Sequence, residues 1–352
     1  MIAWLAIVAF AAPPREVGAA PDAHAQRPVW SPDGTRLAWE ANDVAARRVT
    51  LFTGPVSTAA WTPVRPVAMS TSGLTSGFST VRAATAVFDA AWGPSTSGRL
   101  VCVGATDERD HDLYLDTGTA LAPSPGPDGG PAWSPDGRYV VFTSARTGEG
   151  DLYLLDMTQP ASPPRRLTSD VSASEVWPAW SPDSVSLAWT GHGPTGDTVW
   201  LSPSLDSAPV PLVRWQGSQL HPSFSPDGSR IAWYADRDVP GRFDLWVVAR
   251  AGGDPRRLVD DVVANARGPT WSPTGQSLVV VRNDDQRFDP LVWVPATGGA
   301  ATVLDLGTVN HGDLDVTRGP DGQTWLAWTA QGLVDEQSRA YRRLFVAPIV
   351  VP

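Results

Sequence analysis

The string PVWSPDG at residues 28–34 recurs along this 352-residue chain and decides its fold. Near copies are PAWSPDG (131–137), PAWSPDS (178–184), PSFSPDG (222–228) and PTWSPTG (269–275), and degenerate copies are AAWGPSTSG (90–98) and VTRGPDG (316–322). The aromatic residues of these motifs, or their equivalents, lie at 30, 92, 133, 180, 224, 271 and 318. After a first step of 62 residues the spacing is 41–47, which matches one four-stranded propeller blade.

Each motif also predicts its own local structure. Ser-Pro-Asp-Gly has the residue order of a type I turn, and a short apolar strand such as RLAWEA (36–41) follows it. A second strand such as VTLFTG (49–54) comes next, and several repeats add an outer strand such as PRRLTSD (164–170). We therefore predict an all-β propeller of four-stranded antiparallel blades, with seven blades favoured and six as the alternative. The last unit has room for three strands only, so ring closure needs an outer strand from before Trp30 or leaves one blade short.

The composition excludes several kinds of chemistry. All 27 basic residues are arginine, so the chain has no amine for a Schiff base or a P-loop. Asp outnumbers Glu by 31 to 6, and the net charge of −10 argues against a nucleic-acid partner. Cys102 is the single cysteine, which excludes an intrachain disulfide and a cysteine-based zinc site. We expect no cofactor and no metal, although DRDVPGRFD (236–244) has some of the oxygen ligands of a calcium loop.

The N-terminal run MIAWLAIVAFAA (1–12) has the apolar character of a secretory signal, although it lacks a basic residue. The alternative is a hydrophobic strand of the fold. We expect cleavage near Ala25, or earlier near Ala11, and therefore assign residues 1–25 to a signal peptide or disordered N-terminus and 26–352 to one propeller domain. The protein is then expected to be periplasmic or secreted, without a membrane span in its mature form, and monomeric.

The repeat as a whole resembles a known family. Trp-Ser-Pro-Asp-Gly, an apolar strand, Asp-Leu-Tyr or Asp-Leu-Trp, and then Pro-Arg-Arg-Leu is similar to the repeat of TolB-like periplasmic propellers, which also occurs in the propeller half of prolyl-oligopeptidase-type enzymes. The resemblance covers residues 26–350 and implies a propeller fold, usually six-bladed in TolB-like proteins. It also implies partners in the cell envelope, such as a peptidoglycan-associated lipoprotein.

Repetition within the chain separates residues of the fold from candidate functional residues. Twelve of the 17 tryptophans recur at fixed positions of the repeat, so we interpret them as packing between blades. The aspartates of the turns are interpreted in the same way. No Gly-x-Ser-x-Gly nucleophile elbow is present, and the five histidines lack the spacing of metal ligands. We therefore expect a protein that is not an enzyme.

One position of the repeat varies in its chemistry. The third residue before each motif aromatic, here called the ring position, is in turn Arg27, Asp89, Gly130, Trp177, His221, Gly268 and Asp315. If each blade begins with its inner strand, as the resemblance implies, these residues surround one mouth of the central channel. Glu175 and His311 lie close by in the sequence and join the candidate binding site. The leading hypothesis is a scaffold that binds a protein or peptide there; the alternative is a polysaccharide lyase or hydrolase using carboxylates and His221.

Overall fold

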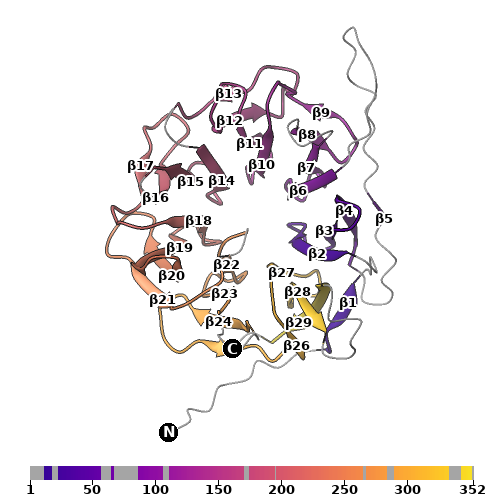
Figure 1. Cartoon of the computed structure of the whole chain (residues 1–352), viewed down its shortest axis with the longest axis vertical. Helices are drawn as coiled ribbons and strands as arrows, with labels where there is room; N and C mark the ends of the chain where they lie inside the picture. Colours follow the sequence, from indigo (N-terminus) through magenta and orange to yellow (C-terminus); the bar gives the residue numbers. More distant parts are fainter. Residues whose placement is uncertain are drawn as a thin grey trace.

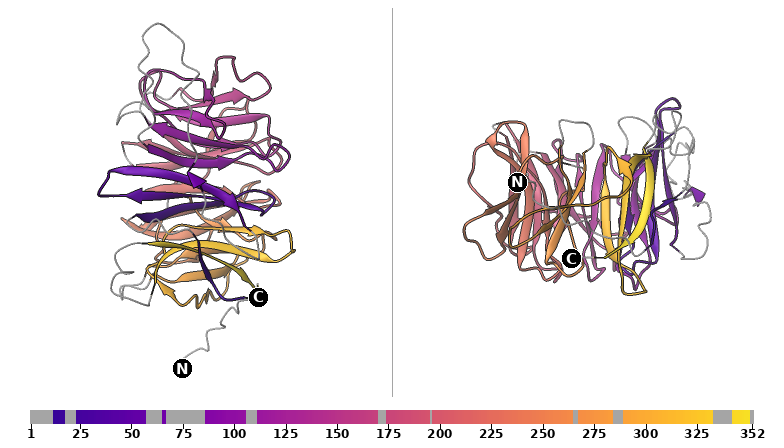
Figure 2. Two further views of the ribbon diagram at one scale, coloured as in Figure 1. Left: turned by 90° about the vertical axis from the view of Figure 1, so that its right-hand side faces the viewer. Right: turned by 90° about the horizontal axis from the view of Figure 1, so that it is seen from below.

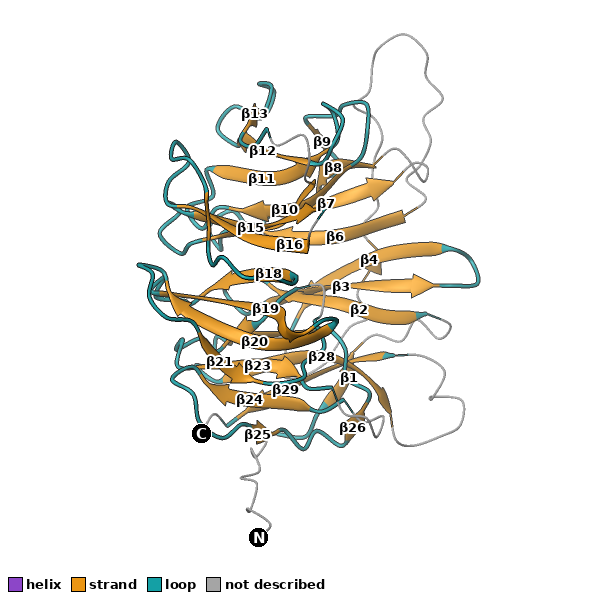
Figure 3. Cartoon of the chain, turned by 60° about the vertical axis from the view of Figure 1, so that its left-hand side comes forward, coloured by secondary structure: helices purple, strands orange, loops and turns teal. Residues whose placement is uncertain are grey.

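The chain folds into a ring of seven antiparallel sheets around a central axis (Figure 1). The computed structural model describes residues 12–17, 23–56, 65–66, 86–105, 111–169, 174–194, 196–264, 267–283, 289–332 and 342–350. Within these residues every regular element is a strand, so none forms a helix that could cross a membrane (Figure 3). The prediction of an all-β propeller with seven blades is confirmed.

The first four blades follow one another along the chain, and each has four strands in sequence order. Blade 1 contains β2 (His24–Trp30), β3 (Arg36–Asp43), β4 (Arg48–Pro55) and β5 (Arg65–Pro66). Blade 2 contains β6 (Ala86–Trp92), β7 (Leu100–Ala105), β8 (His111–Leu115) and β9 (Ala120–Leu121). Blade 3 contains β10 (Asp128–Trp133), β11 (Tyr139–Ser144), β12 (Asp151–Asp156) and β13 (Arg165–Arg166). Blade 4 contains β14 (Ser174–Trp180), β15 (Leu187–Gly193), β16 (Gly196–Ser202) and β17 (Val210–Pro211).

The last three blades repeat the pattern with one difference. Blade 5 contains β18 (Gln219–Phe224), β19 (Arg230–Val239), β20 (Arg242–Ala249) and β21 (Arg256–Val259). Blade 6 contains β22 (Thr270–Trp271), β23 (Ser277–Val281), β24 (Leu291–Pro295) and β25 (Thr302–Val303). Blade 7 combines β27 (Leu314–Arg318), β28 (Thr324–Gly332) and β29 (Arg343–Ile349) with β1 (Arg15–Val17), while β26 (Thr308–Val309) pairs with the end of β28. The first strand of each blade lies nearest the axis (Figure 1).

The strand β1 closes the ring. It pairs antiparallel with β29, with Val17 opposite Leu344, so the fourth strand of blade 7 comes from residues before Trp30 (Figure 2). This is one of the two closures that the sequence left open. Residues 15–17 and 24–25 thus belong to the propeller, whereas the predicted domain begins at residue 26. Cleavage near Ala11 would retain β1, and cleavage near Ala25 would remove it.

The repeated motif forms the turn that its residues predict. In blade 1 the Gly34 amide donates to the Ser31 carbonyl at 2.8 Å, and the Ser31 hydroxyl donates to Asp33 at 2.6 Å. The Arg36 amide then donates to the Ser31 hydroxyl at 2.9 Å. The polar side chains of the turn therefore hold the turn itself, and the aspartates at this position are structural.

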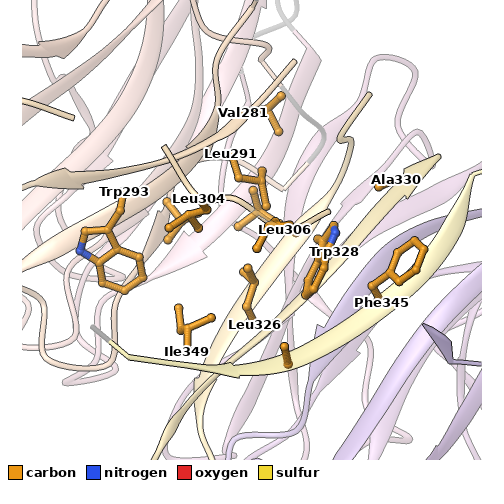
Figure 4. Close-up of a cluster of buried hydrophobic side chains, with 13 residues drawn as sticks. Val281, Leu291, Trp293, Leu304, Leu306, Leu326, Trp328, Ala330, Phe345 and Ile349 are labelled. Carbon is orange, nitrogen blue, oxygen red and sulfur yellow. The ribbon is translucent and has the colours of Figure 1, made fainter. Parts of the chain in front are cut away.

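The core consists of apolar clusters between neighbouring blades. Figure 4 shows one of them, where Leu291 and Trp293 of blade 6 face Leu326 and Trp328 of blade 7. Eleven of the twelve recurring tryptophans are buried, and Trp200 is half-buried. Their interpretation as packing residues is confirmed. Because each cluster involves two blades, the ring is held by neighbour-to-neighbour contacts around its circumference.

Candidate functional site

The ring position has an unusual backbone. In β2, β6, β10, β14 and β18 the pairing is interrupted by a bulge at this position. The residue there has a left-handed φ in six blades: Arg27 48°, Asp89 54°, Gly130 54°, Trp177 52°, His221 54° and Gly268 77°. This conformation costs a non-glycine residue about 1–2 kcal/mol. Two blades use glycine, whereas four retain a large or charged side chain where the backbone favours glycine. Strain of this kind is typical of functional sites.

A cavity of about 390 Å³ occupies the channel beside the ring position. Five of the predicted site residues line it, namely Arg27, Asp89, Trp177, His221 and Asp315. A second cavity of about 310 Å³ shares Asp89, Gly130 and Trp177 with the first and extends between the inner strands and loops of blades 3 and 4. The structure therefore brings most of the predicted residues together on one continuous surface.

Two predicted residues lie elsewhere. Glu175 is 4% exposed, and its carboxylate accepts a hydrogen bond from the Thr168 hydroxyl at 3.2 Å. His311 is also buried; its Nδ1 lies 2.8 Å from the carbonyl oxygen of Asp289 and its Nε2 lies 3.0 Å from the Thr308 hydroxyl. Neither residue lines the two channel cavities. Their sequence positions are close to the ring, but their side chains point into the surrounding structure.

Some ring-position groups hold neighbouring blades together. The Arg27 amide donates to Asp313 of blade 7 at 3.0 Å, and the Asp89 amide donates to Glu40 of blade 1 at 2.7 Å. The Gly130 amide in turn donates to Asp89 at 2.8 Å. The bulges expose these amides, and a carboxylate of the preceding blade satisfies each one. Asp89 therefore has a structural role in addition to its place on the cavity wall.

Aromatic rings cover one side of the cavity. The rings of Trp177 and His221 lie 3.8 Å apart between centroids, at 33°, and His192 contacts Trp177 edge-on at 5.4 Å. His192 is held by Asp197, whose carboxylate oxygen lies 2.6 Å from Nδ1. Burial lowers the pKa of His221 to about 3, so its imidazole is neutral at pH 7. Trp177 and the neutral His221 thus give this side of the site an aromatic surface.

Arg267 is a channel residue that the sequence did not single out. Its guanidinium extends from blade 6 across to blades 1 and 2, where Nη2 donates to the carbonyl of Ala90 at 3.2 Å and lies 3.5 Å from that of Arg27. Nearby, Asp315 accepts hydrogen bonds from the Trp30 and Val316 amides, while burial raises its pKa to about 6. Arg267 directly precedes a ring position, so including flanking residues in the repeat comparison would have found it.

The cavity offers the groups needed for binding. It combines two guanidinium groups and two carboxylates with stacked aromatic rings and proline-rich walls. Within the described residues no three His, Cys, Asp or Glu side chains come together as a metal site. The loop 236–244 has some of the oxygen ligands of a calcium loop. There the Asp236 carboxylate accepts hydrogen bonds from the Ser218 and Gly241 amides, and the Asp244 carboxylate lies 3.2 Å from the Arg257 guanidinium. Convergent charged groups beside aromatic and proline walls suit a peptide-like ligand.

Sequence comparison finds partial matches to known proteins. No family model matches the chain. An uncharacterised protein of Agrobacterium fabrum is 30% identical over 160 residues, which cover 44% of this chain and 51% of that protein. The uncharacterised peptidase YuxL of Bacillus subtilis is 26% identical over 120 residues, covering 32% of this chain and 18% of the peptidase.

Solved structures extend the similarity to the whole ring. TolB of Acinetobacter baumannii superposes with a TM-score of 0.53 at 18% identity, covering 77% of this chain and 66% of TolB. A puromycin-hydrolysing peptidase of Mycobacterium tuberculosis superposes with a TM-score of 0.65 at 16% identity, covering 93% of this chain and 52% of the peptidase. A prolyl endopeptidase superposes with a TM-score of 0.58 at 12% identity, covering 94% of this chain and 50% of the endopeptidase. The resemblance to TolB-like and prolyl-oligopeptidase propellers is thus confirmed as a shared fold. The chain spans about half the length of these two peptidases.

Proposed function

We propose that this protein is a non-enzymatic binding propeller whose channel cavity takes a peptide segment of a partner protein. The observation that carries the proposal is the strained ring position. Four blades place a side chain where the backbone favours glycine, and two blades of the same chain show that glycine fits there. Asp89 and Arg27 also contact neighbouring blades. A ligand therefore best explains Trp177 and His221, which line the cavity at this strained position.

The contacting rings of Trp177 and His221 are the proposed centre of this site. Tryptophan is enriched at binding hot spots because a large rigid ring buries much area at small entropic cost. The rigid ring of blades would also limit the ordering required on binding. By analogy with TolB we further propose a periplasmic or extracellular location and a partner in the cell envelope, such as a peptidoglycan-associated lipoprotein.

A second candidate follows from the peptidase relatives. The propeller matches about half of each of two peptidase structures over nearly its whole length. In this alternative the propeller would select peptides for a catalytic unit. Both candidates require peptide binding in the channel, and they differ in whether bound peptides are cleaved.

The test is binding of the purified protein to an array of diverse 15-residue peptides with both ends blocked. We expect Trp177→Gly to weaken binding of selected peptides at least tenfold while relieving backbone strain. Arg47→Gly is the matched control, because Arg47 also has a left-handed φ, of 50°, in an exposed hairpin. The proposal is wrong if wild type binds no peptide or if both variants bind equally. Cleavage of bound peptides, detected by mass spectrometry, would show that the protein is an enzyme.

A further inference from the structure

Arg267 is a residue of the channel with unused hydrogen-bonding capacity among the described residues. An arginine side chain has five N–H donors. Here Nη2 meets two backbone carbonyls, at 3.2 and 3.5 Å, while Nε is buried without a partner. An unsatisfied buried donor costs about 1–3 kcal/mol. Arg267 lines the cavity, and among the described residues its Nη1 donates to no protein acceptor, so the guanidinium can still donate to a ligand.

The neighbouring carboxylates do not supply that acceptor. Asp315 accepts from the Trp30 amide at 2.8 Å and from the Val316 amide at 2.9 Å. Asp89 accepts from the Gly130 amide. The other arginine of the cavity, Arg27, has a carboxylate neighbour of its own.

Arg27 lies 3.7 Å from the buried carboxylate of Glu40. No ion pair within 4 Å joins Arg267 to an acidic side chain in the part of the chain that the structure describes. Arg267 interacts with Asp315 only through longer-range electrostatic attraction, so among the described residues no carboxylate lies in ion-pair contact with its guanidinium. A carboxylate from a ligand would provide two acceptor oxygens in the geometry that arginine prefers.

The walls around Arg267 define the rest of the ligand. Prolines from four inner strands or their approaches face the cavity, and further apolar side chains complete it: Pro131, Pro178, Pro222, Pro269, Val29, Leu314 and Phe224. A ligand with a carboxylate at one end and an apolar body would satisfy both the guanidinium and the walls. A volume of about 390 Å³ is at the small end of ligand pockets.

We propose that Arg267 binds a carboxylate carried by an apolar group, and that in the bound partner this is the C-terminal carboxylate of the peptide. This inference rests on the proposed function and specifies its ligand. Because the guanidinium of Arg267 crosses the channel to blades 1 and 2, a chain passing through would have to displace it. A chain that ends at Arg267 meets no such obstacle. A small aliphatic acid has the same chemistry and is the other source of this ligand.

The experiment compares three probes by isothermal titration: N-acetyl-alanyl-leucine, its C-terminal amide, and 4-methylpentanoate. Wild type should bind the peptide acid at least tenfold more tightly than the amide. Arg267→Gln should abolish that preference, whereas Arg214→Gln, at an exposed arginine, should retain it. Circular dichroism and the thermal midpoint of each variant confirm that it is folded.

Each outcome bears on the inference. It is overturned if wild type binds neither peptide, if acid and amide bind equally, or if Arg267→Gln keeps the preference. Equal binding of 4-methylpentanoate and the peptide acid would support the carboxylate site and identify a free organic acid as its source. If blocked peptides bind through Trp177 while acid and amide do not differ, the inference fails and the proposed function stands. If the peptide acid binds through Arg267 while blocked peptides do not bind, the inference stands, and the part of the proposed function that centres the site on Trp177 fails.

Discussion

Replacing Val17 by alanine tests whether β1 closes the ring. Val17 is 1% exposed and packs in a cluster with Trp30, Leu37 and Leu344. The change removes two buried carbon groups at about 0.8 kcal/mol each, so about 1.6 kcal/mol is lost. The cavity left behind increases the loss toward about 3 kcal/mol. Even the smaller figure lowers the ratio of folded to unfolded protein about 15-fold.

The assay is urea unfolding of wild type, Val17→Ala and the control Val44→Ala. Val44 is 62% exposed in the hairpin between β3 and β4, so its substitution should change the unfolding free energy by less than about 0.5 kcal/mol. Hydrogen exchange should also show faster exchange of the β29 amides in Val17→Ala. If the two variants unfold alike, β1 does not contribute to the stability of blade 7 and the account of ring closure is wrong.

Three further predictions concern the ring and its charges. Gly34→Ala should destabilise more than Gly98→Ala, by about 1–3 kcal/mol in urea unfolding, because both glycines have positive φ but only a Cβ at Gly34 would meet a carbonyl oxygen of blade 7, at 2.5 Å. Equal losses would refute that contact. Arg146→Met leaves the buried carboxylate of Asp128 without its 3.1 Å partner, so the unfolding free energy should fall by about 3 kcal/mol at pH 7 and by less at pH 5, where Asp128, whose pKa burial raises to about 6, is protonated. A pH-independent loss would contradict this. Finally, burial lowers the pKa of His221 from 6.5 to about 3, so between pH 7 and pH 5 the unfolded chain binds a proton at His221 and the folded protein does not. Over this range the unfolding free energy of wild type should therefore fall by about 2 kcal/mol more than that of His221→Gln. If the unfolding free energies of the two proteins change in parallel with pH, this role of His221 is excluded.

Much of the fold could be predicted from the sequence because the blades are local. The spacing of the turn motif gave the number of blades, and Ser-Pro-Asp-Gly gave a turn whose hydrogen bonds stay within six residues, from Ser31 to Arg36. The source of the fourth strand of blade 7 remained open, because three residues at 15–17 carry no repeat signal. Their strand exists only through pairing with β29, more than 300 residues away.

The sequence predicted which repeat positions line the channel cavity, but it did not predict where longer side chains extend. Trp177 and His221 were found because their register places them on the inner strand, and the bulge then turns both into the channel. Glu175 is two residues before Trp177, but its side chain bonds with Thr168 instead. Arg267 was missed because its chemistry depends on reaching the opposite side of the channel, and a linear pattern does not record that distance.

Ring closure by β1 and β29 also sets an order for biosynthesis. Arg15–Val17 is the earliest strand of the described chain to be made, and its partner Arg343–Ile349 is the last. Blades 1 to 6 can each form from neighbouring segments, whereas blade 7 must wait until nearly the whole chain has emerged. If the protein is exported as proposed, β1 would cross the membrane before the other described strands and would wait longest for its partner. Until β29 arrives, blade 7 and blade 1 would each expose an incomplete face, so chaperone binding during synthesis should concentrate there.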